Sequence, residues 1–239
     1  MTGVQTCALP ISQHPGSDRF VLSKGHAAPI LYAAWAEAGL FDRAELLTLR
    51  ELTSDLEGHP TPRLSFVDVA TGSLGQGICA AIGSALNARR IKSDYRTYVL
   101  IGDGESAEGS VWEAAMFAAH HGLSNLTVVA DMNGQQAYGL TAHVSAADNM
   151  AERWAAFGWR VSTVDGHAAA ELASALAPVP QNTRPHIVLA KTVFGRGVEF
   201  MEQGVPLTQR HLPVQAINWH YLPMSDEEFD IALRGLGGN

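Results

Sequence analysis

Two side chains with metal-binding oxygens, Asp103 and Asn133, follow two successive apolar runs. Asp103 lies between two glycines after the run 98–101, and Asn133 follows the run 126–130. The 30 positions from one to the other (133 − 103 = 30) contain a helical pattern at about 109–121. Consecutive parallel strands joined by a crossover helix usually lie side by side. We therefore expect Asp103 and Asn133 to be neighbours at the carboxyl edge of a sheet, where α/β folds bind ligands.

The chemistry of this pair is that of a metal bound together with a diphosphate. Carboxylate and amide oxygens are the ligands that Mg²⁺ or Ca²⁺ prefers. The glycines beside Asp103 allow a diphosphate to approach the backbone closely. A Gly-Asp-Gly triplet by itself is an ordinary turn, so the prediction depends on the strand–helix–strand pattern around it.

Three histidines and one glycine-rich stretch are further candidates. His26 stands on a turn before a predicted helix, His59 in a loop beside Pro60, and His220 in the tail. Each also has a structural interpretation, because a lone histidine at such a position more often fastens a loop or is simply solvated. The stretch 71–77 precedes a predicted helix, which suits either phosphate contacts at a helix N-terminus or close backbone packing.

The elements that must position these residues follow from the hydrophobic pattern. Residues 20–23 form a short apolar entry, residues 53–66 a loop, and the region from about 195 an irregular tail. Strands are predicted at about 96–102, 125–131, 159–164 and 186–192. Helices are predicted at 30–39, from a capping box at Asp42 and Glu45 to about 52, at 75–91, 109–121, 146–157 and 168–177, and from Ser225 to Arg234. Strands alternating with helices predict an α/β fold with a doubly wound parallel sheet flanked by helices.

Composition limits the classes of function. The chain has 239 residues, 46% of them hydrophobic, which suits one large domain or a domain with a tail. The net charge is −8 and the basic residues are scattered, so neither nucleic acid nor a membrane surface is an expected partner. No apolar run approaches the length of a membrane span. Cys7 and Cys79 are the only cysteines, so no disulfide framework is expected and the reducing cytoplasm is the predicted location.

The first residues look foreign to the rest of the chain. Residues 3–11, Gly-Val-Gln-Thr-Cys-Ala-Leu-Pro-Ile, are what a common short-read sequencing adapter encodes. We interpret 1–12 as an assembly artefact and exclude it from fold reasoning, as one would a tag. The alternative is a natural N-terminal extension. The artefact interpretation predicts a single domain over 13–239 in a gene truncated at its start.

Five segments, in order, resemble the transketolase family. They are 18–29 (DRFVLSKGHAAP), Gly58-His59-Pro60, 70–77 (ATGSLGQG), 102–105 (GDGE) and 191–197 (KTVFGRG). The resemblance covers about residues 18–235 and is to the first, thiamine diphosphate-binding domain of that family. It implies the thiamine diphosphate-binding fold, diphosphate domain.

The resemblance also implies roles for individual residues. The expected metal ligands are the side chains of Asp103 and Asn133 and the carbonyl of Gln135. The expected cofactor contacts are His26, Gly72, Ser73, Leu74, Gly104, Asn133, Lys191 and His220. The expected catalytic residues are His26, His59 and His220, since histidines titrating near neutrality can move protons to and from sugar hydroxyls.

The implied activity is transketolase activity, which moves a two-carbon ketol unit from a ketose phosphate to an aldose phosphate in the pentose phosphate pathway. Its implied cofactors are thiamine diphosphate as electron sink and Mg²⁺, with Ca²⁺ as the alternative metal.

The chain departs from the family pattern at both ends. The family's preceding segment, with a Ser-Gly-His-Pro motif, is absent, and so is the following pyrimidine-binding domain with its activating glutamate. This resembles split transketolases and implies that the partner is a separate pyrimidine-domain subunit, in a homo- or hetero-oligomer. The alternatives are a non-catalytic cofactor-binding or regulatory subunit, or another thiamine diphosphate enzyme such as deoxyxylulose-phosphate synthase. The Gly-His-Pro loop and the Trp219-His220 pair argue against the synthase.

Overall fold

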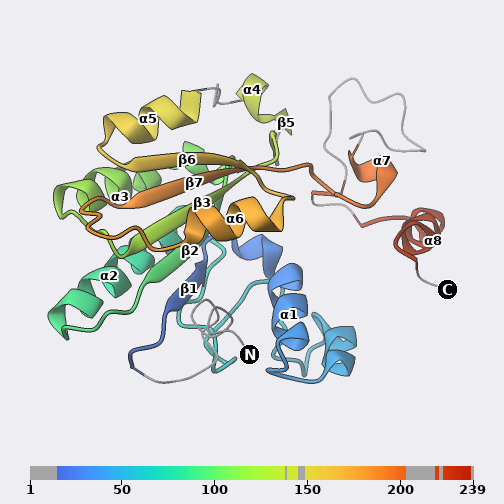
Figure 1. Cartoon of the computed structure of the whole chain (residues 1–239). Helices are drawn as coiled ribbons and strands as arrows, with labels where there is room; N and C mark the ends of the chain where they lie inside the picture. The colour runs from blue at the N-terminus through green and yellow to red at the C-terminus, as the bar shows by residue number, and fades with distance from the viewer. Residues whose placement is uncertain (1–14, 138, 145–148, 203–218, 221–222, 238–239) are drawn as a thin grey trace.

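A five-stranded parallel sheet forms the centre of the fold (Figure 1). The computed structural model describes residues 15–137, 139–144, 149–202, 219–220 and 223–237. Strand order is β1-β2-β3-β7-β6, and each neighbouring pair is parallel. The strands are β1 (Arg19–Leu22), β2 (Thr97–Gly102), β3 (Leu126–Met132), β6 (Arg160–Asp165) and β7 (His186–Lys191). This confirms the predicted parallel α/β architecture.

Helices cover both faces of the sheet. Behind it in Figure 1 lie α2 (Gln76–Arg90) and α3 (Gly109–His120), and α6 (Ala169–Leu176) lies in front of β6 and β7. The remaining helices are α1 (Ala28–Glu37), α4 (Thr141–Val144), α5 (Met150–Ala156), α7 (Glu199–Glu202) and α8 (Asp226–Gly235). Three 3₁₀ turns are η1 (Gly25–Ala27), η2 (Arg43–Thr48) and η3 (Glu105–Ala107). A two-stranded antiparallel ribbon joins β4 (Gln135–Gln136) and β5 (Gly139–Leu140).

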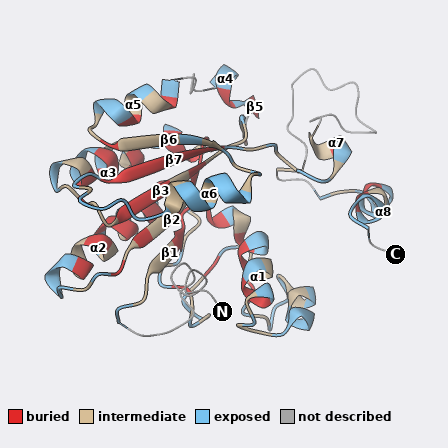
Figure 2. Ribbon diagram, viewed as in Figure 1, coloured by how far each residue is buried: buried red, intermediate tan, exposed pale blue. Residues whose placement is uncertain are grey.

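The main hydrophobic core lies between the sheet and helices α2, α3 and α5. One face of β2, β3 and β7 contributes Val99, Ile101, Val128, Ala130 and Ile187, all fully buried. The helices present small residues opposite these strands, which lets the backbones approach closely. In Figure 2 the central strands are accordingly the most buried part of the fold, whereas α6 is mostly exposed or half-buried. A second cluster packs α1 against the end of β1.

Four elements differ from the sequence prediction. Residues 19–22, expected only as an apolar entry, form β1 and pair with β2. The helix expected over 42–52 is the 3₁₀ turn η2; Asp42 accepts the expected type of cap bond from Ala44 N, but η2 buries no residue. The helix expected from 146 begins at Met150, after a separate short α4. The tail predicted as irregular from 195 contains α7.

The other predicted helices and strands are confirmed to within a few residues. The Ser225 capping box is present, with Ser225 Oγ accepting from Glu228 N and Glu228 Oε2 accepting from Ser225 N. The predicted adapter stretch 1–12 lies outside the described residues. Among the helices that the structure describes, none has both the length and the apolar content needed to cross a membrane.

Candidate functional site

Asp103 and the loop after β3 lie against each other at the carboxyl edge of the sheet. Asp103 follows β2 and is 2% exposed. Its Oδ1 accepts from Gly104 N at 2.7 Å. Its Oδ2 accepts from Gly134 N at 2.7 Å and from Thr141 Oγ1 at 3.2 Å. The Asp103 carboxylate therefore binds the amide that immediately follows Asn133, which confirms the expected adjacency.

Asn133 is held by its own turn. Its Oδ1 accepts from Gln135 N at 2.9 Å, and its Nδ2 donates to Asp131 Oδ2 at 3.1 Å. An amide oxygen has two lone pairs and a carboxylate about four acceptor positions. The Asn133 oxygen and the Asp103 carboxylate therefore each retain acceptor capacity beyond these bonds. Gln135, whose carbonyl was the third predicted ligand, opens β4 beside them.

The donor set fits a metal that is shared with a phosphate ligand. Within the described ranges no group of three or more His, Cys, Asp or Glu side chains could hold a metal. One carboxylate and one amide oxygen are too few for an all-protein cage. Mg²⁺ is typically held by one or two carboxylates together with substrate phosphates. Burial raises the pKa of Asp103, the Asp131 charge adds to this, and the amides of Gly134 and Gly104 oppose it; a cation would offset the lost hydration.

A buried ion pair beside this centre was missed by sequence reasoning. Lys24 Nζ lies 2.5 Å from Asp131 Oδ2, and Thr192 Oγ1 donates to Asp131 Oδ1. Burial alone would raise the pKa of Asp131, but the Lys24 charge and hydrogen bonds outweigh it and lower that pKa. The charged Asp131 thus ties together the carboxyl ends of β1, β3 and β7. The available signals were the position of Lys24 beside His26 and of Asp131 two residues before Asn133.

The three predicted histidines lie close enough to influence one another. The ring centroids of His26 and His220 are 5.5 Å apart. The pKa of His26 is lowered to about 4, mainly by removal of the ring from water and then by the charges of Lys24, His220 and His59, with Asp131 opposing. Burial, followed by Lys24, also lowers the pKa of His220. His26 and His220 are therefore neutral near pH 7, and His26 still keeps solvent-exposed surface.

The glycine-rich loop packs against the His26 turn and the His59 ring. A Cβ on Gly25 would lie 2.8 Å from Gly72 N and from the Thr71 backbone, so only glycine allows this approach. A Cβ on Gly72 would lie 3.1 Å from the His59 ring. Thr71 Oγ1 donates to Leu22 O at 2.7 Å, which joins the loop to β1.

The remaining predicted cofactor contacts lie around the same edge. Ser73 is exposed and Leu74 half-buried, directly before α2. Gly104 packs on Gln136, where an added Cβ would come within 2.6 Å of Cβ. Lys191 ends β7 with an exposed side chain and pairs in register with Met132. A backbone this closely approached, at a helix N-terminus and beside a metal-binding carboxylate, fits a diphosphate.

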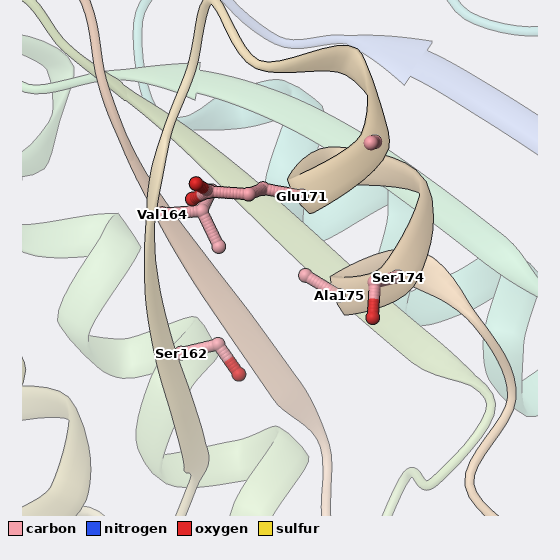
Figure 3. Close-up of a pocket in the computed structure, with 6 residues that line it drawn as sticks. Ser162, Val164, Glu171, Ser174 and Ala175 are labelled. Atoms are coloured by element: carbon pink, nitrogen blue, oxygen red, sulfur yellow. The ribbon is translucent and has the colours of Figure 1, made fainter.

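A groove elsewhere on the protein contains none of these residues. It lies between β6 and α6, has a volume of about 390 Å³ and is open to solvent (Figure 3). Its lining is Ser162, Val164, Ala170, Glu171, Ser174 and Ala175. One carboxylate and two hydroxyls from different elements do not make a recognisable site, so the carboxyl edge of the sheet is the functional candidate.

Comparison with known proteins agrees with this location. The family described as "Transketolase, thiamine diphosphate binding domain" matches residues 9–229. Transketolase-like protein 2 of Bos taurus is 49% identical over 92% of this chain and 34% of its own length. Human transketolase is 50% identical over 80% of this chain and 30% of its own length. The chain thus spans about a third of the length of these relatives.

A relative with a different organisation is covered more fully. This protein is one subunit of the apulose-4-phosphate transketolase of Phocaeicola vulgatus, and it is 37% identical over 91% of this chain and 73% of its own length. Among solved structures, transketolase from Campylobacter jejuni superposes with a TM-score of 0.82 at 28% identity, over 98% of this chain and 37% of that one.

Proposed function

Since the chain belongs to the transketolase family, as its thiamine diphosphate binding domain, we propose that it acts with Mg²⁺ in transferring a two-carbon ketol unit from a ketose phosphate to an aldose phosphate. The observation that carries this proposal is the Asp103 carboxylate bound to the Asn133 turn, with three histidines grouped beside the same sheet edge. The metal oxygens and the proton-transfer groups that this chemistry needs are thereby supplied by one region of the fold. Ca²⁺ is the alternative metal.

The chain's own residues divide into a binding set and a proton-transfer set. Asp103, Asn133 and the Gln135 carbonyl hold the metal, and residues 72–74 with Gly104 receive the diphosphate. Lys191, at the end of β7, offers a further cation to the cofactor. Thiamine diphosphate, when bound, supplies an electron sink for breaking a carbon–carbon bond next to a carbonyl.

His26, His59 and His220 orient the sugar and move its protons. The lowered pKa values of His26 and His220 keep both rings neutral near pH 7. A neutral imidazole accepts a proton from a sugar hydroxyl through its unprotonated nitrogen or donates a hydrogen bond to a carbonyl oxygen. His26 and His220 are also proposed as cofactor contacts, because both lie beside Lys24 and Asp131.

The activity requires a partner in this proposal. One relative is by its name a single subunit of a transketolase, and this chain covers most of that protein. We therefore assign the missing pyrimidine-binding function to a separate subunit, within a cytoplasmic homo- or hetero-oligomer that acts on sugar phosphates.

The experiment is a reconstitution with two readouts. Calorimetry measures thiamine diphosphate binding with and without Mg²⁺, and a coupled assay measures ketol transfer from a ketose phosphate to an aldose phosphate. We expect no transfer by the chain alone and transfer after addition of a pyrimidine-domain subunit encoded beside it. Transfer by the chain alone would refute the two-subunit proposal. Cofactor binding by a complete pair that shows no transfer would favour a non-catalytic binding subunit.

A further inference from the structure

Glu105 is a buried carboxylate with no role in the site as described so far. It follows Gly104 directly and is 2% exposed. Its Oε1 accepts from Ser23 Oγ at 2.5 Å and from Gly75 N at 2.8 Å. Its Oε2 accepts from Gly102 N at 3.2 Å. Both carboxylate oxygens are therefore used within the protein.

The three donors come from three separate segments of the site. Ser23 follows β1 and leads into the turn that carries His26. Gly75 is the N-cap of α2 and ends the glycine-rich loop. Gly102 ends β2, immediately before Asp103. One side chain thus joins the histidine turn, the glycine-rich loop and the metal-binding turn at a single point.

The charge of Glu105 argues against direct contact with the cofactor. A carboxylate repels a diphosphate, and the Glu105 oxygens already accept three hydrogen bonds. Gly75 has φ +80, a left-handed conformation that turns the loop into α2, and its amide is engaged by Glu105. An amide at a helix N-terminus is otherwise an anion donor. The amides left to face a phosphate therefore lie before Gly75, in residues 72–74.

We propose that Glu105 is the positioning residue that fixes the glycine-rich loop relative to Asp103, so that the diphosphate and its metal are held in register. The inference rests on the proposed function. Its physical basis is that Ser23, Gly75 and Gly102 are all buried, so removing the carboxylate leaves three donors without their acceptor. Unsatisfied buried donors are costly, and the loop will move to reach water.

The test compares Glu105→Ala and Glu105→Gln with Glu152→Ala, which removes an exposed carboxylate on α5. Calorimetry measures the affinity of the chain, with its partner subunit, for thiamine diphosphate and for inorganic diphosphate, each with Mg²⁺. We expect Glu105→Ala to weaken both by about 10- to 100-fold. Glu105→Gln retains one acceptor oxygen and should fall between wild type and Ala. Glu152→Ala should bind like wild type.

A second arm reads the loop directly, without cofactor or activity. Hydrogen exchange of the chain alone should be about tenfold or more faster at residues 72–75 and at Gly102 in Glu105→Ala, and unchanged in Glu152→Ala. If Glu105→Ala does not fold, Glu105→Gln and Ser23→Ala replace it, and in each both the exchange increase and the affinity loss should be smaller.

The outcomes separate this inference from the proposed function. Affinity and exchange within about twofold of wild type in Glu105→Ala and Glu105→Gln would overturn the positioning role. If wild type itself binds no thiamine diphosphate, the proposed function fails. In that case unchanged loop exchange in the variants overturns the Glu105 inference, and faster exchange confines it to fixing the loop.

Discussion

His59 and His220 reach the site from loops rather than from the core. The His59 ring packs on Gly72, and the His220 ring stacks on Phe194 with centroids 6.2 Å apart. We expect His59→Ala and His220→Ala each to lower kcat/KM about 10²- to 10⁴-fold, the usual range for a positioned acid–base group. The fold should survive because His59 is exposed and His220 only half-buried. Steady-state kinetics of the reconstituted pair measure the effect, with the exposed His120→Ala as control; unchanged turnover would return that histidine to a structural role.

Asp103 carries the metal prediction. Asp103→Ala removes the only carboxylate of the predicted ligand set, and Asn133 with one carbonyl cannot hold a hard dication against water. We expect Mg²⁺-dependent binding of thiamine diphosphate to be lost in calorimetry. The matched control is Asp230→Ala, an exposed carboxylate on α8. Cofactor affinity equal to wild type in Asp103→Ala would refute the metal assignment.

Sequence reasoning reached some of these residues and missed others for a physical reason. Asp103 and Asn133 could be paired because the alternation of strand and helix fixes which strand ends are neighbours. The Lys24–Asp131 pair spans 107 positions and depends on β1 lying beside β2. Because β1 is only four residues long, its pattern was too short to predict a strand. The same gap hid the Ser23–Glu105 bond.

Individual elements teach a similar lesson about local and tertiary signals. The capping pattern at Asp42 and Glu45 predicted a helix, yet η2 buries no residue and ends where Arg50 takes φ +65. Local caps do not sustain a short helix that lacks an apolar face to bury. By contrast, α2 and α3 were predicted nearly to the residue, because both bury a continuous face against the sheet.

The paired strands β6 and β7 contain a buried histidine that makes stability depend on pH. His186 is 1% exposed, accepts from Arg160 Nη2 at its Nδ1 and contacts Ser162 Oγ through its Nε2. Burial, then the charges of Arg160 and Arg96, lower the pKa of His186 from 6.5 to about 4. Between these values the unfolded chain binds the proton and the folded chain does not. Stability is therefore fully present above pH 6.5 and is lost as the pH falls toward 4.

We expect this one group to reduce the free energy of unfolding by up to about 1.4 kcal/mol per pH unit in that window. Urea denaturation of the chain at pH 7, 6 and 5 measures the dependence. His186→Gln should flatten it relative to wild type, whereas the exposed His143→Gln should not. A pH dependence identical in wild type and His186→Gln would contradict the assignment.

The whole chain exposes large apolar side chains in keeping with a protein that works in an assembly. Met116 and Phe117, consecutive on α3, are 58% and 42% exposed. Exposed apolar side chains of this size favour association. We expect the purified chain to sediment as a dimer or larger species at micromolar concentration, and Met116→Lys to shift it toward monomer. Leu52→Lys, in a loop where the wild-type side chain is fully exposed, is the control. A monomer at every concentration would count against the oligomer.

The short strand β1 gives the protein a place where folding and ligand binding meet. Within the described sheet β1 lies at the edge and pairs only with β2. Its end supplies Ser23 to Glu105 and Lys24 to Asp131. If β1 detaches, the site loses its histidine turn while Asp103 and Asn133 stay in place. Fraying of one edge strand would thus switch off catalysis long before the molecule melts, and a bound cofactor should protect this strand from proteolysis.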